Sequence, residues 1–479
     1  MIKSTWQLEN SYETLPPIFH SSVTPERVEQ PEIVLWNEPL AKQLGLTESF
    51  YQDEQVLAGN EFPDDAAQLA QSYAGHQFGR LNILGDGRAV LIGEKVLNDT
   101  RFDIQLKGSG RTPYSRGGDG RAAIGPMVRE YIISEAMHGL NIPTTRSLAV
   151  TKTGEIIYRD TILQGAVLTR IASSHLRVGT FTFATQLGKL SDLKALADYA
   201  IKRHDRDLVS DENRYEKFLQ RVIERQAQLI AKWQLVGFIH GVMNTDNMTI
   251  SGETIDYGPC AFMDSFDPDT VFSSIDTEGR YAFGNQPSIG GWNLARFAES
   301  LIPILHEERD EAIKIAKAQL ATYPEKFNAY FQKGLREKLG MLTEQEGDND
   351  LTVQFLQLLM KYDVDYTNVF RGLTAKVRPS DSLFVTNDFK AWEQRWHERL
   401  TVENRSLEEI YKQMDTVNPA VIARNYQVER AIKAAEEGDF AVVEELVSIL
   451  RNPYEVASEF ELYKYPNDDD EPYQTYCGT

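Results

Sequence analysis

Three short stretches between positions 81 and 107 have the pattern of β-strands. Leu81–Leu84 and Ala89–Ile92 are mainly apolar and flank a Gly-Asp-Gly turn, and in Phe102–Lys107, which follows, apolar and polar residues alternate with a period of two. This period places every second side chain on one face of a strand. The pattern predicts an antiparallel sheet, followed by a loop over 108–126, where glycine and proline are too frequent for a regular element.

Helical periodicity appears after this loop. Apolar residues spaced by four, from Val128 to Leu140, predict an amphipathic helix. Asp439 is a good N-cap, and we expect the last helix to begin there. The other predicted elements are an ordered extension over 1–75, strands at 147–150 and 166–171, a helical stretch over 189–236 that ends at Gly237, and mostly helix from 292 to about 452.

The composition is that of an acidic globular protein. The 50 Lys and Arg residues stand against 71 Asp and Glu, which gives a net charge of −21, and 42% of residues are hydrophobic. Nonspecific binding to nucleic acid or to an anionic membrane requires a basic face, so we expect neither partner. Apolar runs fall short of the ~18 residues of a membrane span. With two cysteines and no signal-like segment, we expect a cytoplasmic protein.

Residues 107–121 form a local basic island in this acidic chain. Four basic residues and five glycines accompany a single acid, Asp119. Glycine lets backbone amides approach an anion, and arginine offers forked donors that match phosphate oxygens. The segment therefore indicates a phosphate-binding loop, although an exposed basic loop has the same composition.

The turn at Gly85–Arg88 partly matches the glycine-rich loop that covers nucleotide phosphates in protein kinases. An ordinary hairpin turn is the alternative, because Asp-Gly is a common hairpin signal. Lys107 closes a later strand, and Glu130 lies 23 residues further on, in a predicted helix. A strand lysine paired with a helix glutamate orients nucleotide phosphates in kinases. Glu135 is the competing partner.

The block from His240 to Gly258 is the most specific motif. Kinases place an asparagine five residues after a catalytic aspartate, and a metal-binding aspartate beyond a short hairpin. Here Asn247 and Asp256 occupy the two metal positions, and their oxygen ligands suit Mg²⁺ or Mn²⁺. Val242 fills the position of the base and cannot accept a proton, so Asp246 is the candidate for a displaced base. A turn-capping aspartate is the alternative reading of Asp246.

These motifs resemble those of the selenoprotein O family of protein adenylyltransferases, a branch of the protein-kinase-like fold. The resemblance covers nearly the whole chain and rests on Tyr73–Gly79, Gln105–Arg116, Ala172–Phe181 and the block at 240–258. It implies an α+β, two-lobed kinase-like fold with an antiparallel β N-lobe and a helical C-lobe. The expected parts are an N-terminal extension (1–75), an N-lobe with nucleotide-binding loops (76–165), a C-lobe with the catalytic and metal motifs (166–300), a helical extension (301–460) and an acidic mobile tail (461–479).

The resemblance also implies an activity: transfer of AMP from ATP, or UMP from UTP, to Ser, Thr, Tyr or His side chains of client proteins, with self-modification as a further outcome. The nucleotide is expected in an orientation flipped relative to kinases. Asp246 would be the general base, Glu130 would position Lys107, and Asn247 and Asp256 would hold Mg²⁺ or Mn²⁺. The expected nucleotide-binding residues are Gly85, Gly87, Arg88, Lys107, Asp119, Gly120, Arg170, Arg177 and Asp256.

Cys477 occupies a place corresponding to the selenocysteine of eukaryotic members of this family, and Cys260 follows the metal motif closely. A reversible Cys260–Cys477 disulfide is one hypothesis, and two unlinked thiols are the alternative. Two other functions stay open at this point. One is a phosphotransferase that passes the γ-phosphate to a small molecule, and the other is a catalytically dead nucleotide-binding scaffold.

Overall fold

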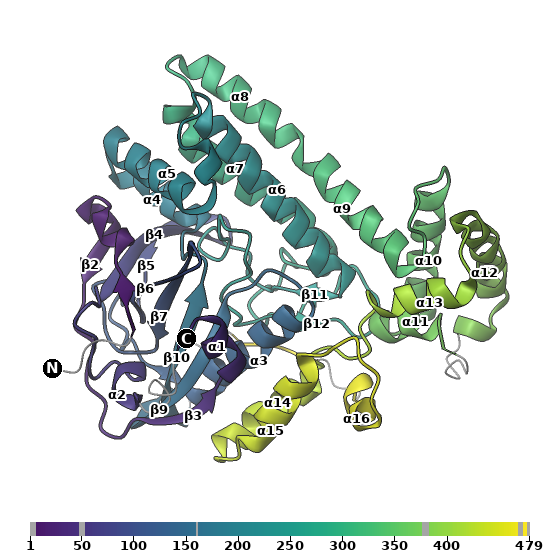
Figure 1. The fold of residues 1–479 in the computed structure, drawn as a ribbon, viewed down its shortest axis with the longest axis horizontal. Helices are drawn as coiled ribbons and strands as arrows, with labels where there is room; N and C mark the ends of the chain where they lie inside the picture. Colours follow the sequence, from purple (N-terminus) through teal and green to yellow (C-terminus); the bar gives the residue numbers. More distant parts are fainter. Residues whose placement is uncertain (1–5, 47–52, 160, 376–382, 468–472, 477–479) are drawn as a thin grey trace.

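A ten-stranded antiparallel sheet makes up most of the N-terminal half of the protein (Figure 1). This computed structural model describes residues 6–46, 53–159, 161–375, 383–467 and 473–476. The strand order is β2-β4-β6-β7-β10-β9-β3, with β1 paired to β6, β5 to β4 and β8 to β10. The strands are β1 (Leu8–Glu9), β2 (His20–Ser22), β3 (Glu32–Trp36), β4 (Leu69–Gln77), β5 (Arg80–Gly85), β6 (Ala89–Leu97), β7 (Thr100–Lys107), β8 (Ala122–Ala123), β9 (Arg146–Tyr158) and β10 (Ile162–Ala172).

The strands predicted between 81 and 171 are confirmed, and the sheet is larger than expected because the first 75 residues add to it. β3 pairs with β9 and β2 pairs with β4, so this extension forms part of the sheet as well as wrapping it. The boundaries predicted at 75 and 165 fall inside β4 and β10. Both strands are hydrogen-bonded to their neighbours in the sheet, so the structure has no break between units at either position.

Helices form the C-terminal half, which confirms the two-lobed, kinase-like fold class (Figure 1). The stretch predicted over 189–236 is two helices, α5 and α6, because the chain turns after Asp205, whose carboxylate pairs with Arg225 of α6. Gly237, with φ of +73°, follows α6. The helices as far as α9 are α1 (Glu38–Gln43), α2 (Glu54–Leu57), α3 (Ile124–Gly139), α4 (Val178–Leu187), α5 (Leu190–His204), α6 (Arg214–Leu235), α7 (Gln286–Leu305), α8 (Arg309–Ala321) and α9 (Tyr323–Lys338).

The remaining helices form a separate group at the right of Figure 1, then return to the sheet. They are α10 (Asp348–Tyr362), α11 (Tyr366–Gly372), α12 (Asn387–Leu400), α13 (Leu407–Asp415), α14 (Asn425–Glu436), α15 (Ala441–Leu450) and α16 (Glu461–Lys464). The helix expected to start at Asp439 is α15, and the Asp439 carboxylate accepts a hydrogen bond from the Ala441 amide at 3.1 Å. It is not the last helix, because α16 follows within the segment expected to be a mobile tail.

The helices α14 and α15 pack against α3 and lie beside it in Figure 1. The approach is close at Gly139, where a Cβ atom would lie 2.2 Å from the carbonyl oxygen of Leu450. Arg451 adds an ion pair to Glu135 of α3 at 3.2 Å. The end of the chain therefore supports the helix that carries Glu130.

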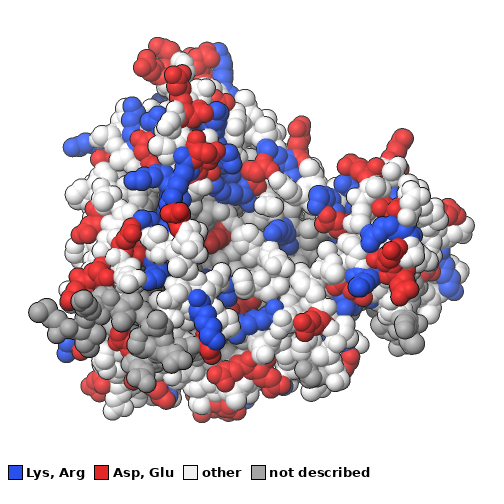
Figure 2. Space-filling model, viewed as in Figure 1, with Lys and Arg blue, Asp and Glu red and all other residues white. Residues whose placement is uncertain are grey.

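Basic and acidic side chains are interspersed over the face drawn in Figure 2. Within the described residues, no helix combines the length and apolar character needed to cross a bilayer. The antiparallel pair of β11 (Phe238–Ile239) and β12 (Ala261–Phe262) brackets the block at 240–258. This block contacts α6 through Gln226 and Trp233, and the sheet through Lys107.

Candidate active site

One cleft of about 1060 Å³ collects the residues singled out from the sequence. It lies where the sheet, α3 and the 240–258 block meet. The predicted site residues that line it are Gly85, Gly87, Arg88, Lys107, Asp119, Gly120, Glu130, Arg170, Arg177, Asp246, Asn247 and Asp256. Segments more than 150 residues apart in sequence thus contribute to one site.

Lys107, at the end of β7, pairs with Glu130 of α3, with 2.6 Å between Nζ and Oε2. Both side chains are buried. The competing partner Glu135 is held by Arg146 at 2.6 Å and by Arg451, on the opposite side of α3. The structure therefore selects Glu130 as the helix glutamate that orients Lys107.

Asp256 is surrounded by three cations. Its carboxylate lies 2.9 Å from Lys107 Nζ, 2.7 Å from an amino group of Arg170 and 2.6 Å from an amino group of Arg177. Burial alone would raise its pKa, but the charges of Lys107, Arg170 and Arg177 hold the pKa of Asp256 well below its ordinary value. Asp256 is thus ionised throughout the physiological range. Its φ of +61° is unusual for a residue other than glycine and turns the carboxylate toward β7 and β10.

Asp246 has the opposite surroundings. It is buried, and its Oδ1 atom has no hydrogen-bond partner within the part of the chain that the structure describes. Burial raises its pKa to about 6, although Arg177 opposes the shift. The backbone of β4 passes directly over it, because a Cβ atom at Gly75 would lie 2.3 Å from that oxygen. Asp246 is a carboxylate poised to accept a proton near neutral pH.

Asn247 and Asp256 both line the cleft and bring hard oxygen atoms to it. The amide nitrogen of Asn247 donates to the carbonyl of Val242 at 3.0 Å, so a ligand role falls to its oxygen. Asp246, whose Oδ1 has no hydrogen-bond partner among the described residues, lines the same cleft. The described residues contain no cluster of three or more His, Cys, Asp or Glu suited to a metal. This donor set fits Mg²⁺ or Mn²⁺, which bind one or two carboxylates together with phosphate oxygens.

The glycine-rich loop at 108–121 packs onto the turn at 85–88. Thr112 donates to the carbonyl of Asp86 at 2.6 Å, and Ser115 donates to that of Gly87 at 2.5 Å. The ring of Tyr114 covers Gly85 so closely that a Cβ atom there would lie 2.5 Å away. The two predicted phosphate loops therefore form one wall of the cleft.

Asp119 lies in this wall, and its carboxylate already accepts hydrogen bonds from other residues of the protein. Arg159, in the β9–β10 turn, donates to both oxygens at 2.8 and 2.9 Å, and the amide of Arg121 donates at 3.0 Å. The hydrogen bond from Arg159 lowers the pKa of Asp119. These contacts hold the loop in place next to Gly120. The sequence did not indicate a role for Arg159.

Three further residues of the site were not predicted individually, although each stands in one of the motif segments named from the sequence. Gln105 faces Arg170 across β7 and β10 and accepts from its guanidinium at 2.6 and 3.2 Å. Asp86 is buried below the turn, where desolvation raises its pKa to about 6, and Tyr73 lies under Arg177 with 4.6 Å between the guanidinium carbon and the ring centroid. Gln105 could have been found, since it is two residues from Lys107 on the same strand face.

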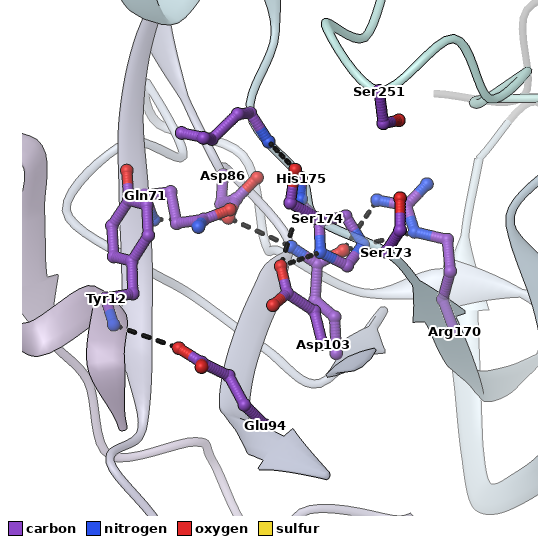
Figure 3. Close-up of polar contacts among 12 residues, drawn as sticks. Tyr12, Gln71, Asp86, Glu94, Asp103, Arg170, Ser173, Ser174, His175 and Ser251 are labelled. Carbon is purple, nitrogen blue, oxygen red and sulfur yellow. Dashed lines mark hydrogen bonds and ion pairs between the residues drawn. The ribbon is translucent and has the colours of Figure 1, made fainter. Parts of the chain in front are cut away.

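A polar network ties the turn between Asn247 and Asp256 to the sheet, and Figure 3 shows part of it. Glu253, in the turn between Asn247 and Asp256, accepts from the hydroxyl of Ser173 at 2.6 Å and from that of Ser251 at 3.1 Å. His175 contacts Asp103 through both its amide and Nδ1, each at 2.9 Å. These contacts fix the segment that leads to Arg177.

Cys260 lies outside the cleft lining and is fully buried, and burial raises the pKa of its thiol to about 12. Cys477 lies outside the described residues, so the predicted disulfide stays a hypothesis. The described end of the chain is packed nearby: the hydroxyl of Thr475 donates to the carbonyl of Pro259 at 2.8 Å, and that of Tyr473 bonds with Arg129 at 2.7 Å. Part of the predicted mobile tail thus borders the cleft.

The antiparallel sheet, the helical half and the lysine–glutamate pair define a protein with a kinase-like fold. A family profile described as "Protein adenylyltransferase SelO" matches residues 3–451, and the chain belongs to this family.

Three similar proteins are each named "Protein nucleotidyltransferase YdiU". That of Geobacillus kaustophilus (strain HTA426) is 57% identical over 480 residues, 99% of both chains. That of Halalkalibacterium halodurans is 56% identical, over 99% of this chain and 98% of its own. That of Brevibacillus brevis is 55% identical, over 100% and 99%. The chain is accordingly a nucleotidyltransferase.

Proposed function

We propose that this protein transfers AMP from ATP, or UMP from UTP, to Ser, Thr, Tyr or His side chains of client proteins or of itself. The observation that carries the proposal is a contrast inside one cleft. Asp246 is a buried carboxylate whose Oδ1 has no hydrogen-bond partner among the described residues, whereas a group of cations surrounds Asp256. The first can take a proton, and the second can bind phosphate charge.

The phosphates are assigned to the cations. Lys107, Arg170 and Arg177 would hold the terminal phosphates, with the turn at 85–88 and the loop containing Gly120 over the nucleotide. In this flipped orientation the α-phosphorus faces Asp246. The Arg177 guanidinium bonds the carbonyl of Asp246 at 2.5 Å and so links the two parts of the site.

The chemistry then follows from these positions. The acceptor hydroxyl loses its proton to Asp246, its oxygen bonds to the α-phosphorus, and the bond between that phosphorus and pyrophosphate breaks. The cations stabilise the negative charge that develops on pyrophosphate. Asn247 and Asp256 would hold Mg²⁺ or Mn²⁺, which neutralises phosphate charge when bound.

Labelled ATP tests the reaction class. Incubation of the purified protein with a divalent metal and α-labelled ATP should label protein, and intact-mass measurement should show the addition of one nucleoside monophosphate. Transfer of γ-label to a small molecule would instead establish the phosphotransferase. Absence of any transfer, with cellular function kept by Asp246→Ala, would establish the scaffold.

A further inference from the structure

A group of aromatic and basic side chains lies beside the cleft, and the assignments above do not use it. It consists of His76 and Phe78 from the β4–β5 hairpin, Arg280 from the segment before α7, and Trp292 and Arg296 from α7. We call it the arginine–tryptophan platform. Trp292 and Arg296 are four residues apart and share one face of α7.

The platform is built around the indole ring of Trp292. The guanidinium carbon of Arg280 lies 4.9 Å from the ring centroid and that of Arg296 lies 5.3 Å away. The imidazole of His76 meets the same ring edge-on, with 5.4 Å between centroids. Stacking of guanidinium on indole orients the fork of donors without using them, so the donors stay available to a ligand.

The two arginines of the platform differ in their ion pairing. Within the described ranges, Arg280 makes no ion pair, and the Nε atoms of Arg280 and Arg296 are buried without hydrogen-bond partners. The neighbouring Asp276 gives its two oxygens to the backbone amides of Arg280 and Tyr281, at 2.9 and 2.7 Å. Arg296 has a carboxylate partner, the exposed Glu299. Arg280 is therefore the guanidinium group of the platform that is left without an ion pair among the described residues.

The platform is fastened to the loop that carries Asp246. The side-chain oxygen of Asn244 accepts from the Phe78 amide at 3.1 Å and from the Tyr281 hydroxyl at 2.5 Å. The hydroxyl of Thr245 accepts from the His76 amide at 2.8 Å. Phe78 and Asn244 also line the cleft. A chain bound on the platform would therefore pass within a few residues of Asp246.

We infer that the arginine–tryptophan platform docks an acidic segment of the acceptor protein, an inference that rests on the proposed function. Forked guanidinium groups match carboxylates, and unpaired charge beside a reaction centre gives specificity through complementarity. Glu or Asp residues near the acceptor hydroxyl would bind Arg280 and Arg296, while Phe78 offers apolar contact. Nucleic acid is the less suitable occupant, because it needs an extended basic surface.

Synthetic peptides test this inference. The probes are a peptide with one Tyr flanked by Glu, its counterpart with Gln in place of Glu, and its counterpart with Lys, each offered with α-labelled ATP. The full-length wild-type protein should modify the Glu peptide with kcat/KM roughly tenfold above that for the Gln peptide, mainly through KM. This preference should shrink as salt is added.

Variants of Arg280 locate the effect. Arg280→Gln should remove the preference for Glu, and Arg280→Glu should shift it toward the Lys peptide, a gain that a merely damaged protein would not show. Lys314→Gln makes the same charge change on the exposed face of α8 and should leave the preference at the wild-type level.

Two negative results have distinct meanings. If α-label reaches no peptide and no protein, the proposed function fails. If label is transferred but the Glu, Gln and Lys peptides react equally well in wild type and in Arg280→Glu, the proposed function stands and the platform inference is overturned.

Discussion

Asp246 and Asp256 lie ten residues apart on one hairpin, and their surroundings differ in almost every respect. Asp256 contacts three cations, whereas the Oδ1 atom of Asp246 contacts no hydrogen-bond donor among the described residues. The pKa of Asp256 is held well below its ordinary value, while that of Asp246 is raised to about 6. Two carboxylates whose pKa values are pushed apart can divide the work of charge binding and proton transfer.

Replacement of Asp256 should give the largest effect. Asp256→Ala removes the carboxylate proposed to bind the metal and leaves Lys107, Arg170 and Arg177 without their shared partner. We expect transfer of α-label to fall by at least about 10²–10³-fold, comparable to the loss of a preorganised charge-stabilising group. The control is Asp198→Asn, which removes the charge of an exposed aspartate paired with Arg214 and should leave transfer at the wild-type level. Wild-type transfer by Asp256→Ala would contradict the assignment.

Replacement of Asp246 should separate catalysis from stability. Asp246→Asn keeps the shape of the side chain but cannot accept the proton, so we expect kcat to drop by about 10²–10⁴-fold. Because the wild-type carboxylate is buried and its Oδ1 has no partner in the part of the chain that the structure describes, the variant should be at least as resistant to heat as wild type. A rate loss accompanied by a lower Tm would point to a structural role instead.

The pH profile should follow Asp246. The base acts in its ionised form, so the transfer rate should rise with pH through about 6 and fall about tenfold per unit below it. Asp256 stays ionised over this range and adds no step. Asp86 has a similar pKa of about 6, so Asp86→Asn is the control and should keep the step. The step should be absent from the residual activity of Asp246→Asn.

The smallest effect is expected in the turn that joins the two carboxylates. Glu253→Ala leaves Ser173 and Ser251 without their partly buried acceptor and should lower the free energy of unfolding by about 1–3 kcal/mol in urea titrations. Glu253→Gln keeps an acceptor and should lose less. Equal stability of both variants and wild type would show that this network does not hold the hairpin.

Local spacing predicted much of this site from sequence. The pairing of Lys107 with Glu130 was predicted because the two residues stand 23 positions apart, on a strand and a helix whose periodicity is clear. The positions of Asn247 and Asp256 were predicted from their spacing in the motif. Arg159, which holds Asp119, and Gln105, which holds Arg170, depend on strand pairing that sequence spacing does not reveal. The order of the strands in the sheet could not be predicted for the same reason, because β1, β2 and β3 pair with strands more than 45 residues away in the sequence.

The support of α3 by α14 and α15 has a consequence for the order of synthesis. Glu130 belongs to the first third of the sequence, whereas the helices that brace its helix come from the last 55 residues. A ribosome releases the N-terminal portion first. A nascent chain therefore cannot brace the helix that carries Glu130 until α14 and α15 have also been synthesised.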